Sequence, residues 1–130
     1  NTEDVMGWEV VDTGLKVLLS KSVPVVVQNY IRPDIERCLR LLGLELEQID
    51  HYITHPGGEK VMQAFCEALG IASQKLENSR LILEEHGNMS SPTVLFILEK
   101  FLEGGFKAGE YGLLTAMGPG FSAEHVVLKT

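Results

Sequence analysis

The sequence predicts an α/β domain in which a mixed β-sheet is layered with α-helices. Along the chain, two kinds of segment alternate. In one kind the apolar residues have period two, and in the other they recur every three or four positions. Such alternation is typical of layered α/β domains. The 130 residues are 45% apolar and 22% charged. A folded chain of this length buries roughly 65–70% of the surface that it exposes when unfolded, which is enough for a core without disulfides or metals.

The first third of the chain predicts a strand pair and a long helical segment. Residues 7–12 and 15–20 are short β-favouring runs separated by a Thr-Gly turn, which indicates a hairpin. From Val23 onward, apolar residues recur at helical spacing until Gly43. Because Pro33 lies inside this pattern, we expect either one bent helix or two short ones.

The middle third predicts a strand, a loop and two helices. Residues 49–54 have period two and precede His-Pro-Gly-Gly at 55–58, a loop signal that ends a strand. A helix is expected from Glu59 to Leu69, because its apolar residues share one face. Another helix is expected over 79–86.

The last third predicts one apolar helix and two strands. Ser91 is a candidate N-cap, with Pro92 in the first turn, for a helix that reaches about Glu103. Residues 93–98 of this helix are apolar all round, so protein has to cover every side, and we do not expect this domain to do so alone. The two strands are expected at 111–117 and 124–128.

Composition and charge argue against some classes of function. Eleven Lys and Arg stand against eighteen Asp and Glu, for a formal charge of −7, and the charges are interspersed, so nucleic acid is not an expected partner. The longest apolar run, residues 94–98, is far shorter than the about 20 residues that cross a bilayer. The two cysteines indicate reduced thiols in a cytoplasmic protein. We expect no signal peptide, and because the first residue is Asn1 rather than Met we expect a chain cut from a longer one.

Histidine and cysteine spacing predicts neither a metal site nor a thiol nucleophile within the chain. His51 and His55 are four residues apart, which on a strand separates them by about 13 Å, and no third ligand lies nearby, so no metal is expected. About 14 Å of helix rise separates Gly57 from Cys66, which argues against a Cys66–His55 pair. Cys38 lies mid-helix among leucines, and both cysteines are expected to be small core residues.

Two residues lie where a ligand could bind. His55 follows the carboxyl end of a predicted strand, where open α/β sheets place their ligand crevice. Asn88 lies in a loop just before a helix N-terminus, which provides positive potential for an anionic group. From local sequence alone, a structural role for His55, an Asx turn at Asn88 and an ordinary tight turn at 118–120 stay open.

Four motifs together resemble the C-terminal domain of the chalcone and stilbene synthase family, the type III polyketide synthases of the thiolase superfamily. They are His-Pro-Gly-Gly at 55–58, Ser-Arg at 79–80, Gly-Asn-Met-Ser-Ser-Pro-Thr-Val-Leu-Phe at 87–96 and Gly-Pro-Gly-Phe-Ser at 118–122. Their order and separations match from Trp8 to Leu128. Related ketoacyl synthases of fatty-acid initiation share the fold but usually carry Gln-Ala-Asn after the His, where this chain has Pro-Gly-Gly.

The resemblance implies a thiolase-like half-fold over residues 1–130 and an acyltransferase activity for the whole enzyme. In this family a Cys–His–Asn triad condenses an acyl-CoA starter with malonyl-CoA by decarboxylative Claisen condensation, and the match assigns the triad residues His55 and Asn88. The nucleophilic Cys belongs to an N-terminal domain that we expect to be missing here, since neither Cys38 nor Cys66 matches it. The fragment alone is therefore expected to be inactive. The resemblance implies no cofactor beyond the CoA thioester substrates, and a homodimer for the whole enzyme.

These residue types suit the implied chemistry. Decarboxylation of a malonyl thioester places negative charge on the thioester oxygen, where a neutral imidazole N–H and a carboxamide NH2 offer two donors. Aspartate could not replace Asn88, because an ionised carboxylate only accepts hydrogen bonds. An imidazolium beside the Cys would also lower the pKa of its thiol.

The resemblance also places residues near the substrate. Those that match the elongation and cyclisation cavity are Trp8, Val17, Ser90 and Pro119; those near the path of the CoA arm are Gly57, Gly58 and Lys60. Val17 stands where plant enzymes often carry a gatekeeping Phe, and Trp8 where they have a small residue. We expect an aliphatic starter and a pyrone-type product, while simple solvation of Lys60 also accounts for its charge.

Two other functions stay open at this stage. One is a ketoacyl synthase of fatty-acid initiation, against which the missing Gln-Ala-Asn argues. The other is a complete, non-catalytic binding or assembly module with a degenerate site. The coding sequence upstream of Asn1 distinguishes them, because a Cys at a strand-to-helix turn supports the synthase and a start codon supports the module.

Overall fold

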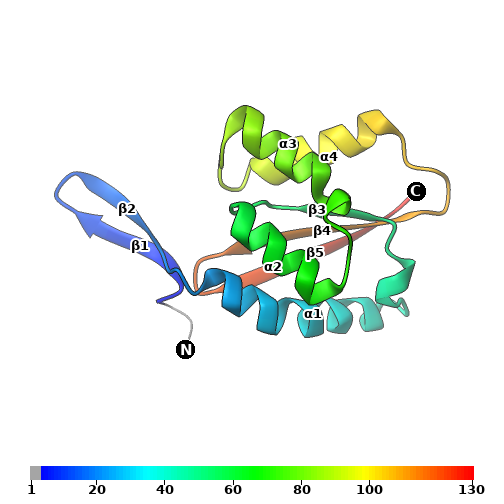
Figure 1. The fold of residues 1–130 in the computed structure, drawn as a ribbon, viewed down its shortest axis with the longest axis horizontal. Coiled ribbons are helices and arrows are strands. Elements are labelled where there is room, and N and C mark those ends of the chain that lie inside the picture. The colour runs from blue at the N-terminus through cyan, green and yellow to red at the C-terminus, as the bar shows by residue number, and fades with distance from the viewer. Residues whose placement is uncertain (1–3) are drawn as a thin grey trace.

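A computed structural model describes residues 4–130 as a three-stranded sheet with helices on both faces and a separate two-stranded hairpin (Figure 1). In chain order the strands and helices are β1 (Met6–Val11), β2 (Gly14–Leu19), α1 (Val23–Leu41), β3 (His51–Thr54), α2 (Glu59–Leu69), α3 (Glu77–His86), α4 (Thr93–Gly104), β4 (Tyr111–Gly118) and β5 (Ser122–Lys129). Short 3-10 turns lie at Leu46–Gln48 and Ser73–Leu76.

Strands β3, β4 and β5 form a mixed sheet in the order β3-β4-β5. β3 runs parallel to β4 with Thr54 opposite Thr115, and β4 runs antiparallel to β5 with Thr115 opposite His125. The connection from β3 to β4 contains α2, α3 and α4. Because parallel strands end at the same edge of a sheet, the residues that follow β3 and β4 lie on one side of the molecule.

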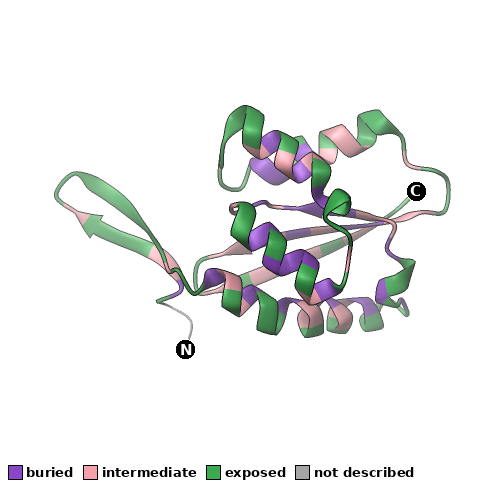
Figure 2. Ribbon diagram, viewed as in Figure 1, coloured by how far each residue is buried: buried purple, intermediate pink, exposed green. Residues whose placement is uncertain are grey.

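Helices α1 and α2 cover one face of this sheet, and α3 and α4 cover the other (Figure 1). Successive side chains of a strand point to opposite faces. Tyr52 therefore packs in the core with α1 and α2, whereas Ile53 packs with Ile82 of α3 and Ile97 of α4. Figure 2 shows the buried residues on the helix surfaces turned toward the sheet. The predicted layering of a mixed sheet with helices is confirmed.

Helix α1 is a single helix although it contains Pro33. Proline removes the hydrogen bond to the carbonyl four residues earlier, which here belongs to Asn29. Both Pro33 and Asn29 are exposed, so solvent can bond that carbonyl. The buried residues keep their helical spacing through this point: Val23, Val27, Ile31, Ile35 and Leu39. Of the two expected forms, the structure therefore shows one helix rather than two.

The predicted N-cap of α4 is wrong. Pro92 rather than Ser91 holds the N-cap position, and no side chain caps the helix there. The Thr93 hydroxyl, which lies inside the helix, instead accepts a hydrogen bond from the Met89 backbone N–H at 2.9 Å. This bond stabilises the preceding loop, whereas the sequence pattern predicted that Ser91 would cap the helix itself.

Two further boundaries shift because 3-10 turns precede the regular elements. β3 begins at His51 rather than at 49, since residues Leu46–Gln48 form a 3-10 turn. α3 begins at Glu77 rather than at 79 and follows the 3-10 turn Ser73–Leu76 directly. The helix expected from Glu59 to Leu69 has those bounds in the structure.

The predicted hairpin forms, but it stands apart from the sheet and points away from the body of the domain (Figure 1). Trp8 lies opposite Val17, and Val10 lies opposite Leu15. All four residues are exposed, so this part of the chain has an apolar face that the described residues do not cover.

Helix α4 is only partly covered, as its all-round apolar sequence predicts. Val94 and Ile97 are buried against the sheet side. Leu95 is 61% exposed, Phe96 39% and Leu102 63%. Within residues 4–130, no helix combines the length and the apolar character needed to cross a membrane.

Candidate active site

Most of the predicted site residues lie at the edge of the sheet where β3 and β4 both end. The loop after β3 contains His55, and the loop between α3 and α4 contains Asn88 and Ser90. The turn after β4 contains Pro119. In Figure 1 all three connections lie at the left-hand edge of the sheet, near the base of the hairpin.

Both ring nitrogens of His55 are engaged. The Gly57 backbone N–H donates to Nδ1 at 3.2 Å, and Nε2 lies 3.0 Å from the Ser90 carbonyl oxygen. An amide N–H only donates and a carbonyl oxygen only accepts. These partners therefore select the neutral imidazole tautomer that carries its proton on Nε2.

Burial lowers the pKa of His55 below its usual value, while hydrogen bonds to the Ser90 carbonyl and the Asn88 side chain act in the opposite direction. Desolvation disfavours the charged imidazolium, which is the dominant effect here. The ring is therefore predominantly neutral near pH 7, the state in which Nε2–H is a donor and Nδ1 an acceptor.

Asn88 joins His55 at this site and also forms an Asx turn. Its Oδ1 accepts a hydrogen bond from the Ser90 backbone N–H at 2.9 Å. With that oxygen held in the turn, the carboxamide NH2 is the group that Asn88 can offer to a ligand. The turn and the ligand-facing role are thus compatible.

Ser90 contacts His55 through its backbone rather than through its side chain. It is the non-glycine residue with a positive φ within residues 4–130, at +63°. This left-handed conformation costs of order 1 kcal/mol for a residue with a Cβ. It directs the Ser90 carbonyl to His55 Nε2 while the residue stays exposed.

Gly57 is required by the geometry of the histidine loop. Its φ is +55°, and a Cβ built at this position would lie 3.3 Å from Val61 Cγ1. A side chain would therefore both strain the backbone and press on the first turn of α2. Gly57 is predicted to lie near CoA; its N–H bond to His55 Nδ1 gives it a second, structural reason to be glycine.

The other two residues predicted near CoA lie at the start of α2. Gly58, with a φ of +149°, holds the N-cap position of the helix. Lys60 is exposed in the first turn. Their proximity to a CoA arm stays a prediction.

The Ser-Arg pair at 79–80 holds the site from α3. The buried Ser79 hydroxyl donates to the Thr54 carbonyl at 2.8 Å, at the end of β3. Arg80 pairs with Glu59 of α2, with Nε 3.2 Å from Oε1. This motif therefore ties α3 both to the strand that precedes His55 and to the helix that follows it.

The hairpin residues predicted to line the cavity are not joined to His55 within residues 4–130. Trp8 is 54% exposed and Val17 51%, and no hydrogen bond or ring contact in that part of the chain links either to the imidazole. Pro119 is exposed, and its neighbour Gly120 donates to the Met6 carbonyl at 3.3 Å, which ties the β4–β5 turn to the base of the hairpin.

Neither cysteine contacts His55. Cys66 is buried on α2, and burial raises the pKa of its thiol. Cys38 is half-buried on α1. The prediction that both cysteines are small core residues is confirmed for Cys66, whereas Cys38 is only half-buried and does not belong to the buried core of residues 4–130.

Thr115 belongs to the site, although no motif in the sequence pointed to it. The Thr115 carbonyl accepts the His55 backbone N–H at 2.9 Å, so β4 holds His55 one residue past the end of β3. Only the parallel pairing of the two strands reveals this contact. The signal available in sequence was a threonine three residues before the Gly-Pro-Gly turn.

Comparison with known proteins matches the whole chain to one family. The family model for the C-terminal domain of chalcone and stilbene synthases covers residues 1–130. A "Putative chalcone synthase" of Bacillus subtilis is 41% identical over 124 residues, which are 95% of this chain and 34% of the relative. The 1,3,6,8-tetrahydroxynaphthalene synthase of Streptomyces peucetius is 37% identical over 130 residues, 99% of this chain and 34% of the relative.

Solved structures agree with this match. The chain superimposes on PKS-I of the brown alga Ectocarpus siliculosus with a TM-score of 0.92 and 27% identity, over 100% of this chain and 36% of that one. The bacterial type III polyketide synthase that makes tetrahydroxynaphthalene in Streptomyces coelicolor gives a TM-score of 0.91 and 31% identity, over 98% and 36%.

The chain thus spans about a third of the length of these relatives and shares the thiolase-like fold of the type III polyketide synthase structures. Three of the four motifs that carry the resemblance meet at the edge of the sheet: the loops after β3 and before α4, and the turn after β4. The fourth, Ser-Arg at 79–80, ties α3 to the end of β3 and to α2. The chain belongs to the chalcone and stilbene synthase family, of which it is a C-terminal domain.

Proposed function

We propose that this chain supplies the His and Asn of a type III polyketide synthase that condenses acyl-CoA starters with malonyl-CoA. One observation carries the proposal: His55 is held as a neutral ring with its proton on Nε2, next to Asn88, at the edge of the sheet. Two fixed donors at one point are what a developing enolate needs.

In the first proposed step, malonyl thioester loses carbon dioxide. The electron pair of the broken C–C bond moves into the new C=C bond as the thioester C=O pair moves to oxygen, which gives an enolate. The Nε2–H of His55, now bonded to the Ser90 carbonyl, and the NH2 of Asn88 donate to that oxygen. Removing one such donor from an enzyme typically costs about 100-fold to 1,000-fold in rate.

In the second proposed step, the enolate carbon attacks an acyl group held as a thioester on a cysteine. The new C–C bond forms, the C–S bond breaks, and the thiolate leaves. The high pKa that burial gives Cys66 is unsuited to a leaving group or a nucleophile. We therefore infer that the reactive cysteine lies in an N-terminal part of the full-length protein.

The class of product has to be measured by assay of the full-length protein. The cavity residues Val17 and Trp8 motivate an aliphatic starter and a pyrone-type product. Two of the proteins that this chain resembles are named for 1,3,6,8-tetrahydroxynaphthalene. Product analysis should therefore look for both classes, with malonyl-CoA alone and with added acyl-CoA.

The test places His55→Ala and Asn88→Ala in the full-length protein and follows malonyl-CoA decarboxylation and product formation. We expect both rates to fall at least about 100-fold in each variant. The matched controls are His86→Ala and Asn29→Ala, which remove an exposed imidazole and an exposed carboxamide elsewhere. Wild-type rates in the two site variants would refute the proposed roles, and a wild-type protein without decarboxylation would favour a binding module.

A further inference from the structure

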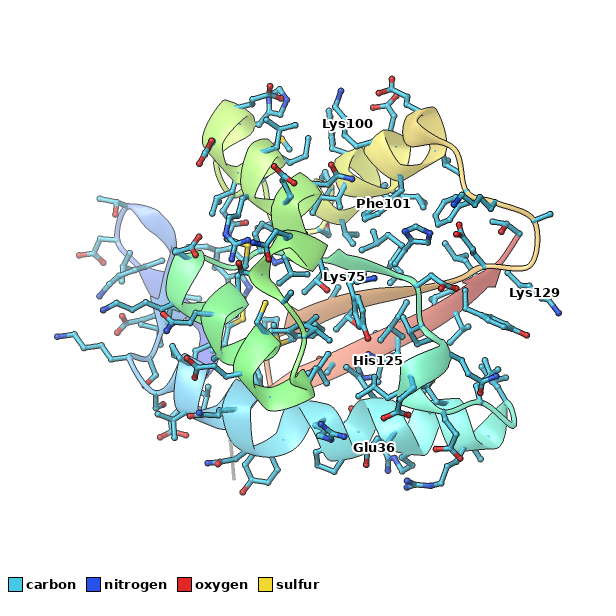
Figure 3. All side chains as sticks on the ribbon, turned by 45° about the vertical axis from the view of Figure 1, so that its right-hand side comes forward. Glu36, Lys75, Lys100, Phe101, His125 and Lys129 are labelled. Carbon is cyan, nitrogen blue, oxygen red and sulfur yellow. The ribbon has the colours of Figure 1, made fainter. Side chains whose placement is uncertain are left out.

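A chain of side-chain hydrogen bonds crosses the face of the sheet that α1 and α2 cover. The Thr115 hydroxyl on β4 lies 3.1 Å from Nδ1 of His125 on β5, and Nε2 of His125 lies 3.2 Å from Oδ2 of Asp34 on α1. Figure 3 shows His125 on β5, on the side of the sheet where α1 runs. Helix α1 is thereby joined at one level of the sheet to two strands near the other end of the chain.

The direction of these bonds follows from the groups involved. The Asp34 carboxylate only accepts, so Nε2 of His125 carries a proton, and in the neutral ring Nδ1 then accepts from the Thr115 hydroxyl. Arg37 donates to the other Asp34 oxygen at 2.6 Å, so both oxygens of the carboxylate are bonded. Thr115 is fully buried, and the His125 side chain is only 6% exposed, so leaving either group unpaired would be costly.

Thr115 links this chain to the candidate catalytic histidine. Its hydroxyl bonds to His125, and its carbonyl accepts the backbone N–H of His55. His55 lies one residue beyond the β3–β4 ladder, whose last pair is Thr54 with Thr115. The position of His55 therefore depends on where Thr115 is held in the sheet.

We propose that Asp34 and His125 are positioning residues that hold His55 in place through Thr115. The inference rests on the proposed function of His55 and adds two residues from α1 and β5 that do not belong to the Cys–His–Asn triad. A misplacement of about 1 Å in a catalytic group can cost about 100-fold in rate. The buried polar chain keeps the strand end in register against such a shift.

The structure offers a matched control at the opposite end of β3. Nε2 of His51 lies 2.8 Å from Oε2 of Glu110, another histidine–carboxylate pair on the same sheet. The His51 ring also packs against Phe101 and Phe106. Replacing His51 should therefore remove a similar histidine–carboxylate hydrogen bond and leave the contacts of Thr115 and His55 unchanged.

The experiment uses the full-length protein with Thr115→Val, His125→Phe and the control His51→Phe. Thr115→Val keeps the volume and the carbonyl of Thr115 and removes only the hydroxyl, so it tests the inference even if His125→Phe fails to fold. His125→Asn is the conservative variant, because its side-chain amide can still bond the Thr115 hydroxyl. Two quantities are measured: kcat and KM for malonyl-CoA decarboxylation, and the NMR signals of the His55 ring.

We expect Thr115→Val and His125→Phe to lower kcat roughly tenfold or more with little change in KM, and to shift the His55 ring signals. His125→Asn should recover most of the rate, and His51→Phe should leave both readouts unchanged. Comparison with the spectrum of the His55→Ala variant assigns the signals of the His55 ring in the full-length protein. Unchanged His55 signals in Thr115→Val, or equal changes in His51→Phe, would overturn the inference. Shifted signals without loss of kcat would instead refute the proposed role of His55 and leave the positioning intact.

Discussion

At the scale of single residues, the site depends on backbone groups as much as on side chains. The tautomer of His55 is set by the Gly57 N–H and the Ser90 carbonyl. Each of these backbone groups belongs to a residue with a left-handed φ. The resemblance to the family predicted the pair His55 and Asn88, but the contact that orients the imidazole comes from the conformation of the loops around it.

The neutral state of His55 gives a prediction about pH. Because burial lowers the pKa of this imidazole, NMR titration of the full-length protein should show a midpoint below the ordinary histidine value of about 6.5. The folded state then binds fewer protons than the unfolded state between the two pKa values. The contribution of the neutral His55 ring to the free energy of unfolding is therefore fully present above about pH 6.5. It is lost as pH falls through the lower pKa of the folded state.

The control for this titration is His55→Gln, which keeps a polar side chain and removes the titration. The difference in unfolding free energy between wild type and variant should shrink as pH falls below about 6.5. A difference that grows toward acid pH would show that the protonated ring is the favoured state in the fold.

At the scale of elements, turn residues in the sequence predicted those helix ends that depend on the local backbone conformation. The helix from Glu59 to Leu69 begins after a Gly-Gly loop and ends at Gly70 in a left-handed conformation, and both signals are readable in the sequence. The predicted N-cap of α4 was wrong. Pro92 rather than Ser91 holds that position, and the hydroxyl of Thr93, the first residue of the helix, accepts a hydrogen bond from the Met89 N–H. The short 3-10 turns before β3 and α3 carry no periodicity that sequence reasoning could use.

The tie between α3 and β3 gives a prediction about stability. Ser79→Ala removes the buried hydroxyl that donates to the Thr54 carbonyl, and we expect it to lower the free energy of unfolding by about 1–2 kcal/mol. Ser73→Ala, at an exposed serine on the 3-10 turn before α3, should change it by less than about 0.5 kcal/mol. Urea unfolding of both variants checks this, and equal midpoints would show that the tie adds no stability.

At the scale of the whole molecule, two apolar surfaces stand out as uncovered within residues 4–130. One is the outer side of α4, with Leu95 and Leu102 exposed, and the other is the apolar face of the hairpin, with Trp8 and Val17. Contiguous exposed apolar surface is typical of interaction sites in folded proteins. The relatives that this chain matches are about three times as long.

We therefore predict that residues 1–130, expressed alone, associate with themselves and bind a hydrophobic dye. Leu95→Asp should weaken the association, because it places a charge on the exposed side of α4. The control is Leu41→Asp, at the end of α1, where the leucine is 84% exposed against 61% for Leu95. A monomer in sedimentation that binds no dye would contradict the prediction, as would equal effects of the two substitutions.

The sequence by itself determined the alternation of strands and helices, the loops that follow β3 and precede α4, and the residue pair His55 and Asn88. The elements and loops follow from periodicity and turn residues, which are local along the chain, and the residue pair follows from the resemblance of the motifs to the family. Only the tertiary structure decided that Ser90 acts through its carbonyl and that Thr115 holds His55. It also joined Asp34 to His125 across 91 residues of sequence. Strand pairing and helix packing choose these partners, because they bring together groups that no pattern along the chain relates.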